Sequence, residues 1–201
     1  MSMPSERSRQ NGRRIHESMT TQATAPFTRF PRILLVSCLC AGWLAAQSKP
    51  SPPKLDHVFD LHLQLAKPTD VGQIGPAGAR RIVPVAGGTL EGPGLKGKIM
   101  PGADYQIIHP DGLTELDAHY VVQLDNGDQL YVNNRGMRHG PPEVLQKLNS
   151  GQPVDQSLIY FRTVISIETA APALQWMNRT IFVCKGERQP NEAVIHVYRV
   201  N

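Results

Sequence analysis

Cysteine is scarce in this chain of 201 residues: three are present, and only Cys184 lies beyond residue 48. A single thiol in residues 49–201 excludes an internal disulfide and a cysteine metal cage in that part of the chain. The context of this cysteine, Ile-Phe-Val-Cys, indicates a small apolar strand residue rather than a reactive thiol. Disulfide-stabilised and cysteine–zinc proteins are therefore not expected.

An excess of one charge is also missing from most of the chain. The formal net charge is +4, but six of the 21 basic residues and two of the 17 acidic residues lie in residues 1–48. Residues 49–201 therefore hold 15 groups of each sign. A neutral domain has no long-range field that would gather phosphates or anionic lipids, so we expect no nucleic-acid partner.

Long hydrophobic runs are absent as well. The main apolar run spans residues 33–46 and is short for a membrane helix, which needs ~20 apolar residues. It follows Arg29 and Arg32 and ends in small residues, an order typical of a secretory signal peptide. We therefore predict a periplasmic or secreted protein with no stable membrane span after leader cleavage. An uncleaved leader that anchors the chain in a membrane is the alternative.

These features divide the chain into three parts. Residues 1–48 form the predicted leader, residues 49–54 a Pro-rich spacer, and residues 55–201 a single folded domain. The stretch upstream of the apolar run is long for a signal peptide, so Met1, Met3 and Met19 are alternative starts. The sequence does not indicate an oligomeric state.

Helical periodicity is missing over any useful length, and period-two alternation takes its place. Gly and Pro punctuate residues 80–143 every few residues, which is typical of turns between short strands. The predicted strands cover residues 56–66, 81–86, 89–91, 95–100, 113–124, 129–134, 158–169, 176–185 and 193–200. Residues 67–80 are predicted as a loop, and residues 141–148 as one short helix that begins with prolines.

The clearest hairpin is centred on Asn126 and Gly127. Asn-Gly between two β runs favours a two-residue type I′ turn, because both central residues must adopt positive φ. This turn places His119 opposite Asn134.

Many short strands in series with one lone helix predict an all-β meander. Closure into a barrel removes the exposed edges of such a meander, so we predict an antiparallel up-and-down β-barrel, similar in general architecture to lipocalins and streptavidin. Small barrels either fill their interior with side chains or keep room for one ligand. Charged residues on strand faces favour the second option, since a filled interior has no need of them.

Several stretches carry a family resemblance that covers about residues 55–200. They are Gly87–Pro93, Pro101–Tyr105, Asp117–Tyr120, Arg135–Glu143, Tyr160–Thr163, Glu168–Thr169 and Trp176–Asn178. In this order they resemble domain of unknown function 3237, also called uncharacterised protein family 0311. Ile159 and Ile167 depart from the family pattern, which has aromatic residues there. The resemblance implies a compact β-barrel and brings no settled activity.

Common cofactor and catalytic motifs are excluded or weak. Residues 92–97 satisfy G-x-G-x-x-G, but the residues that follow are too short and broken for the helix that a dinucleotide site requires. The six histidines of residues 49–201 form neither H-x-H nor H-E-x-x-H, and His57 and His62 fall on opposite faces of an ideal strand. No nucleophile elbow is present. We therefore predict no cofactor and no metal ion.

Asp117, His119 and Arg162 are the candidate catalytic residues. On an inner wall, Asp117 or Glu168 would act as a base, His119 as a proton carrier and Arg162 as an anchor for a carboxylate or enolate oxygen. The alternative is structural: a salt-bridged plug, or a set that lies on the outer face in water.

A second set of residues is predicted to bind a ligand in the barrel. It combines aromatic and polar side chains: Tyr105, Asn134, Arg138, Tyr160, Glu168, Trp176, Asn178 and Tyr198. The aromatic members suit an aromatic or polyketide-like ligand, and they suit the core and girdle of any β protein equally well.

The predicted function is binding of a small, mostly apolar or aromatic organic molecule inside the barrel. One alternative is a cofactor-free acid/base enzyme, an isomerase, cyclase or dehydratase, that uses the same cavity. The other is a structural barrel whose loops contact a protein partner.

Overall fold

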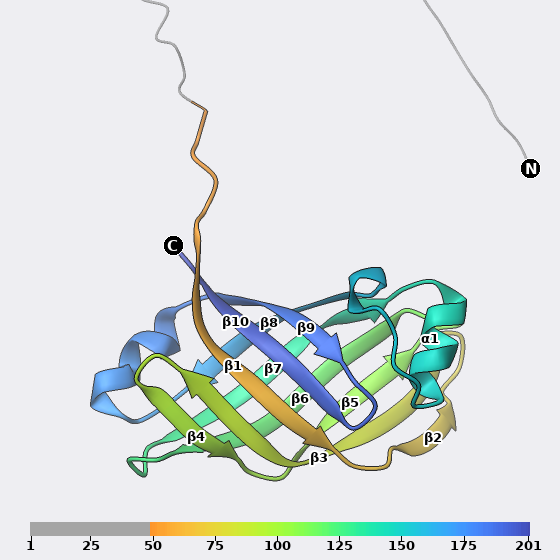
Figure 1. Ribbon diagram of the computed structural model, residues 1–201, viewed down its shortest axis with the longest axis horizontal. Coiled ribbons are helices and arrows are strands. Elements are labelled where there is room, and N and C mark those ends of the chain that lie inside the picture. Colours follow the sequence, from red (N-terminus) through yellow and green to blue (C-terminus); the bar gives the residue numbers. More distant parts are fainter. Residues whose placement is uncertain (1–48) are drawn as a thin grey trace, which may run out of the picture. The chain divides into compact units, whose positions relative to one another are not determined.

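The computed structural model describes residues 49–201 (Figure 1). Its strands are β1 (Leu55–Leu65), β2 (Thr69–Gln73), β3 (Ala79–Gly92), β4 (Leu95–Ile99), β5 (Gly102–Ile108), β6 (Thr114–Leu124), β7 (Gln129–His139), β8 (Tyr160–Glu168), β9 (Phe182–Arg188) and β10 (Glu192–Val200). The helices are α1 (Pro142–Asn149) and two 3-10 helices, η1 (Gln156–Leu158) and η2 (Pro172–Arg179). The predicted leader and its cleavage sites lie outside the described residues.

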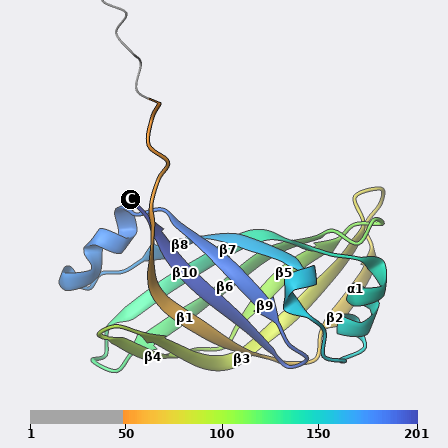
Figure 2. The same ribbon diagram turned by 45° about the horizontal axis from the view of Figure 1, so that its top comes forward.

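The strands form a closed antiparallel barrel, as the sequence predicts. β1 pairs with β10 on one side and with β3 on the other, which closes the ring. β4 and β5 share one position between β3 and β6, so the barrel has eight positions. β2 pairs only with β3 and lies outside the ring. Figure 2 shows the strands crossing the barrel at a common tilt, as closure of a sheet requires.

Period-two alternation decides which side chains fill the barrel. In β6 the buried residues are every second one from Thr114 to Leu124, and β8 alternates in the same way from Phe161 to Ile167. Each buried face is the more apolar face of its strand, because burial of apolar surface is the main favourable term in folding. The more polar face points outward.

The two ends of the barrel differ in their contents. At the end capped by α1, called the α1 end here, Val144 and Leu148 are buried. The opposite end, called the η2 end, is shown in Figure 1 with a second short helix beside it. Its core is wholly apolar and includes the largest fully buried side chains: Phe59, Leu90, Leu130, Met177 and Phe182.

Four segments differ from the sequence prediction. The predicted loop 67–80 contains β2, which is held to β3 by a contact of 2.6 Å between Arg81 Nε and Asp70 Oδ1. β3 continues through the predicted break, because Gly87 and Gly88 adopt positive φ where the strand changes partners. β5 was not predicted, and η2 replaces the first part of the predicted strand 176–185.

The β6–β7 hairpin has a register one residue away from the predicted one. Leu124 N–H donates to the Asp128 carbonyl at 2.8 Å, so the loop has three residues rather than two. Gly127 adopts φ of 91° in this loop. As a consequence His119 lies opposite Asn133, and Asn134 lies opposite Ala118.

Among residues 49–201, no helix combines the length and the apolar composition that crossing a membrane requires.

Candidate functional site

Polar side chains gather inside the barrel at the α1 end. They surround a cavity of about 40 Å³ whose remaining lining is apolar. The polar members come from β5 to β9: Asp104, Gln106, Asn134, Arg138, Thr163 and Arg188. We call these six residues the inner polar cluster. It is the only described part of the barrel interior where a carboxylate and guanidinium groups meet.

Asp104 occupies a break in the β5–β6 ladder. The two strands pair at Asp104 and Ala118 and again at Ile107 and Glu115, and the pairs between are missing. The carboxylate fills this gap: Oδ1 accepts a hydrogen bond from Asp117 N–H at 3.0 Å, and Oδ2 accepts one from Gln106 Nε2 at 2.6 Å. Burial nevertheless raises the pKa of Asp104 above its ordinary value, because the apolar surroundings disfavour the charged form.

Arg138 is the most enclosed charged residue of the cluster, with 7% of its surface exposed. Its guanidinium lies 6.0 Å from the centre of the Phe161 ring, within the range of a cation–π contact. The pKa of Arg138 is lowered to about 10, chiefly by burial; the neighbouring charges of Arg188 and Arg81 act in the same direction, and the charge of Asp104 opposes them. Burial also lowers the pKa of Arg188, and the negative charge of Asp104 opposes this shift. Both guanidinium groups thus feel the charge of one carboxylate, although no ion pair joins either of them to Asp104.

Buried polar atoms without a hydrogen-bond partner concentrate here. Five such side-chain atoms occur among the described residues, and four of them face the same interior: Tyr120 OH, Asn134 Oδ1, Arg138 Nε and Thr163 Oγ1. Burial also raises the pKa of the neighbouring Cys184 thiol to about 12 and that of the Tyr120 phenol above its ordinary value. Both groups are therefore neutral, and they leave the charges of the cluster unchanged.

Asp117 and His119 meet on the outer face of β6. His119 Nε2 lies 2.8 Å from Asp117 Oδ1, and His119 Nδ1 lies 2.7 Å from Tyr131 OH. Partial burial acts to raise the pKa of Asp117, but hydrogen bonds from Arg135 and Asn133 outweigh it and hold this pKa below its ordinary value. The structure thus brings two of the three predicted catalytic residues together, in contact with water.

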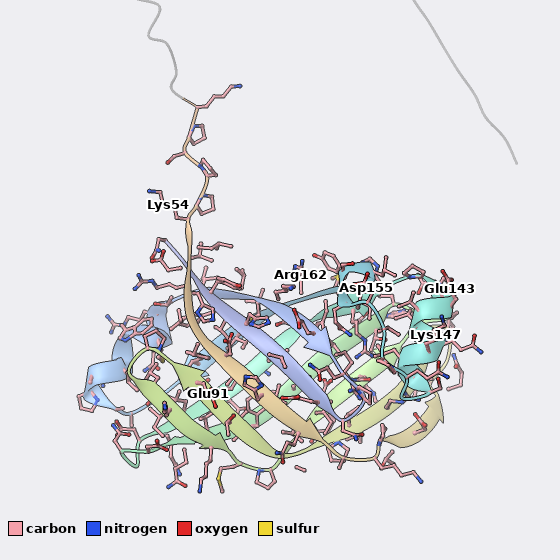
Figure 3. The ribbon with its side chains drawn as sticks, in the orientation of Figure 1. Lys54, Glu91, Glu143, Lys147, Asp155 and Arg162 are labelled. Atoms are coloured by element: carbon pink, nitrogen blue, oxygen red, sulfur yellow. The ribbon has the colours of Figure 1, made fainter. Side chains whose placement is uncertain are left out.

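Arg162 lies apart from them, on the outer face of β8. Its side chain points away from the barrel in Figure 3, and its guanidinium lies 5.3 Å from the centre of the Tyr160 ring. Tyr160 in turn stacks on His139 with ring centres 4.8 Å apart. The expectation that Asp117, His119 and Arg162 share an inner wall is wrong; the outer-face alternative describes their positions. The reason is that the apolar face of each strand turns inward.

The predicted ligand-binding residues divide between the two faces. Asn134 and Arg138 lie inside, in the inner polar cluster, with 4% and 7% of their surface exposed. The other six do not line the cavity: Tyr105, Tyr160, Glu168, Trp176, Asn178 and Tyr198. Asn178 instead caps the end of β8 through both the N–H and the carbonyl of Thr169, at 2.8 and 2.9 Å.

Some of these outer residues line shallow grooves. Tyr160, Arg162 and Tyr198 border one of about 500 Å³, together with Met137 and Val164. Glu168 and Asn178 border another of about 840 Å³ beside the β6–β7 hairpin.

Sequence reasoning missed Asp104, Gln106, Thr163 and Arg188. The position of Thr163 could have been predicted, because it is the polar residue on the strand face that it shares with Phe161 and Ile165. Asp104 gave none, since β5 itself was not predicted. Among residues 49–201, one group of three side chains has the spacing of metal ligands; it lies on the outer face of β1 and β10 and is separate from this cavity.

Comparison with known proteins gives one consistent match. The model of the family described as "Protein of unknown function (DUF3237)" matches residues 53–200. A UPF0311 protein of Rhodopseudomonas palustris (strain TIE-1) is 45% identical over 145 residues, which cover 72% of this chain and 94% of that protein.

Solved structures match the same region. The crystal structure of the conserved protein of unknown function RPA1785 from Rhodopseudomonas palustris has a TM-score of 0.72 and 40% identity, and the match covers 76% of this chain and all of that one. A protein from Acinetobacter baumannii described as beta-barrel like has a TM-score of 0.67 and 35% identity, with 77% and 100% covered.

A more distant similarity reaches a fungal protein. The hydroalkoxylation enzyme phnH of Penicillium herquei is 29% identical over 98 residues, which cover 49% of this chain and 65% of that enzyme.

Proposed function

This chain belongs to the DUF3237 family, and we propose that it binds a small organic anion by its charged head in the inner polar cluster. The anion is a carboxylate, an enolate or a phenolate with a mostly apolar body. Arg138 and Arg188 would hold the negative oxygen, and Asn134 and Thr163 would complete its hydrogen bonds.

The observation that carries this proposal is the charge of the inner polar cluster. Two guanidinium groups and one carboxylate meet in a barrel that is otherwise apolar, so at least one positive charge is uncompensated. A buried, unpaired charge is costly, because it has lost its hydration without gaining a partner. An anionic ligand would supply the missing charge, and it would find the Nε of Arg138 without a partner.

The size of the cavity defines what part of the ligand it accepts. A volume of 40 Å³ suits a head group of few atoms, since a water molecule occupies about 30 Å³ in the liquid. The remaining lining, which includes Leu63, Leu65 and Ile195, is apolar and suits a hydrocarbon or aromatic body. A larger body requires the side chains at the α1 end to move apart when the ligand enters.

A second candidate function is cofactor-free acid/base catalysis at the same place. The raised pKa of Asp104 favours its protonated form, which can give a proton to a substrate, while Arg138 stabilises a negative oxygen that forms in the transition state. The name of the distant fungal relative, a hydroalkoxylation enzyme, describes addition of an alcohol to a double bond, which requires proton transfer. In this reading Asp104 acts as an acid, whereas the sequence suggested Asp117 as a base, and Arg138 takes the role that the sequence suggested for Arg162.

Titration with benzoate tests the proposal. Binding would be followed by NMR on the side-chain amides of Asn134 and Gln106, which face the cavity. Arg138→Met is expected to weaken benzoate binding at least tenfold, because it removes the enclosed cation. Arg162→Met is the matched control: it deletes a guanidinium of the outer face and is expected to leave the affinity unchanged.

Equal losses in Arg138→Met and Arg162→Met, or shifts confined to outer residues, would contradict binding in the inner polar cluster. Native mass spectrometry of the protein from its own host would identify the natural ligand. That compound then separates binding from catalysis. If the unaltered protein does not convert it, the function is binding alone. If the unaltered protein converts it, and Asp104→Asn keeps the affinity but loses the turnover, the function is catalysis.

A further inference from the structure

A second group of side chains with a defined geometry lies on the outer face of β1 and β10. Asp60 Oδ1 lies 2.8 Å from His57 Nε2 and 2.7 Å from His196 Nδ1. These three atoms all lie within 4.8 Å of one another. Asp60 and His196 face each other across the strand pair, with 29% and 27% of their side chains exposed.

A β-bulge places His57 in this group. Residues three apart on a regular strand point to opposite faces, so His57 and Asp60 would not meet. The register of β1 shifts between His57 and Phe59, and the extra residue, Val58, turns His57 to the outer face. Bulges often re-aim a side chain beside a functional site, and this one brings a second imidazole to the same carboxylate oxygen.

We propose that His57, Asp60 and His196 bind a divalent transition-metal ion, of which Zn²⁺ is the reference case. Two imidazole nitrogens and one carboxylate oxygen are ligands that Zn²⁺ prefers, and the exposed side leaves further positions for water or a substrate. Tetrahedral ligand atoms at about 2.1 Å from Zn²⁺ are about 3.4 Å apart. The observed contacts of 2.7 and 2.8 Å need to open by only about 0.6–0.7 Å.

The surroundings of His196 also fit a metal ligand. Its Nδ1 contacts Asp60, while its Nε2 lies 3.7 Å from Glu187 Oε1. Without a metal, a neutral ring that donates from Nδ1 to Asp60 turns the lone pair of Nε2 towards the second carboxylate, which is unfavourable. With a metal ion on Nδ1, the proton moves to Nε2 and donates to Glu187, the carboxylate–histidine–metal arrangement of many metal sites.

The charges of the group favour a cation. With both imidazoles neutral, Asp60 and Glu187 contribute two negative charges, and Lys185, at 2.7 Å from Glu187 Oε1, contributes one positive charge. His57 packs edge to face against Tyr198 with ring centres 5.4 Å apart, which limits the movement of this ligand. The site is separate from the inner polar cluster, so either can exist without the other.

A Zn²⁺ titration of the full, tag-free chain after treatment with EDTA tests the proposal. Calorimetry at neutral pH is expected to show one ion bound per chain. His57→Gln and His196→Gln are each expected to weaken binding at least tenfold, and Glu187→Gln about tenfold, as for other carboxylate partners of ligating histidines. Co²⁺ in place of Zn²⁺ should give visible absorption bands that His196→Gln removes.

His62→Gln is the matched control, because His62 is an equally exposed histidine on β1 that contacts one carboxylate, Glu192, at 3.0 Å and no second histidine. It is expected to leave the affinity within twofold of the unaltered protein. All four variants change exposed or half-buried side chains, and far-UV circular dichroism checks that they fold. Equal weakening by His62→Gln and His57→Gln, or Zn²⁺ binding that a His57→Gln/His196→Gln variant retains, would show that the three side chains form hydrogen bonds only.

Discussion

Asp104 illustrates how the position of one residue sets its chemistry. Its carboxylate accepts two hydrogen bonds, from Gln106 and from the backbone of Asp117, and both favour the charged form. Burial opposes them and raises the pKa. Asp117 lies on the outer face of β6, where hydrogen bonds from Arg135 and Asn133 lower its pKa. Two aspartates linked by one hydrogen bond therefore have opposite shifts.

The raised pKa of Asp104 predicts how stability depends on pH. In the folded protein the carboxyl binds its proton more tightly than in the unfolded chain, so the folded state loses stability as the pH rises from the ordinary value, 3.8, through the raised one. Asp104→Asn removes this proton equilibrium. We therefore expect the stability of Asp104→Asn, relative to the unaltered protein, to increase as the pH rises above about 4. Urea denaturation at a series of pH values measures the difference.

Asp117→Asn is the control of opposite sign. The lowered pKa of Asp117 contributes stability that is present above the unfolded value and is lost as the pH falls through the folded value. The relative stability of Asp117→Asn should therefore decrease as the pH rises from below the lowered folded value to the ordinary value, 3.8. Slopes of the same sign in both variants would contradict the assignment of Asp104 to the buried side of the barrel wall.

At the scale of single elements, one-residue offsets decide which side chains meet. The bulge at Val58 turns His57 towards Asp60. The three-residue loop after β6 places His119 opposite Asn133, whose amide lies 2.9 Å from His119 Nε2. A shift of one residue in either element would move these side chains to the other face or to another partner, because side chains alternate with period two.

Gly127 is the residue that the hairpin loop depends on. Its φ of 91° is unfavourable for residues with a Cβ, although a Cβ built at this position meets no atom within 4 Å. The cost of Gly127→Ala is therefore conformational, and we expect about 1 kcal/mol of lost stability. Gly127→Asn is the control, since asparagine tolerates this region, and it should cost clearly less. Urea denaturation of the two variants checks the order, and equal costs would contradict the loop conformation.

The elements that the sequence predicts well are those with strong alternation. β6, β8 and α1 lie within a few residues of their predicted bounds, because their patterns reflect burial directly. β2 and β5 were missed: β2 is exposed along its whole length and depends on pairing with β3, including the Arg81–Asp70 contact, so its residues show no alternation of burial. η2 was missed as well, since residues 176–179 were predicted as part of a strand.

The candidate site was predictable only in part. Asn134 and Arg138 were named from the sequence, and the structure places both inside the barrel. Asp117 and His119 were expected on the inner wall because a ligand-filled barrel would need polar residues there. This expectation gave more weight to a ligand cavity than to the burial of apolar side chains. In a barrel of eight strand positions the side chains nearly fill the interior, and the apolar face of each strand turns inward.

The whole barrel is divided between an apolar η2 end and a polar α1 end. Phe59 and Phe182 at the η2 end are fully buried members of the hydrophobic core. The inner polar cluster at the α1 end holds buried charges and unpartnered atoms instead. A barrel that served only as a structure would gain stability from apolar residues at both ends. The polar end is therefore expected to reduce stability and to be present for its function.

The double variant Asp104→Asn/Arg138→Met tests this division. It replaces a buried carboxylate and a buried guanidinium with neutral groups of similar size, a change that is often neutral or stabilising by about 1–4 kcal/mol. We expect a free energy of unfolding equal to or above that of the unaltered protein, together with loss of benzoate binding. Phe59→Ala is the control at the apolar end and should cost about 3–5 kcal/mol.

The two measurements together separate function from structure. If the free energy of unfolding of the double variant is lower by more than about 1 kcal/mol, the buried charges stabilise the barrel. Their presence would then be explained by folding and not by a ligand. If it is as stable as the unaltered protein and still binds benzoate, the anion site lies elsewhere, for example in the outer groove beside Arg162. Retained stability with lost binding would mean that the α1 end holds charges that folding does not need, which is the expected signature of a ligand site inside a barrel.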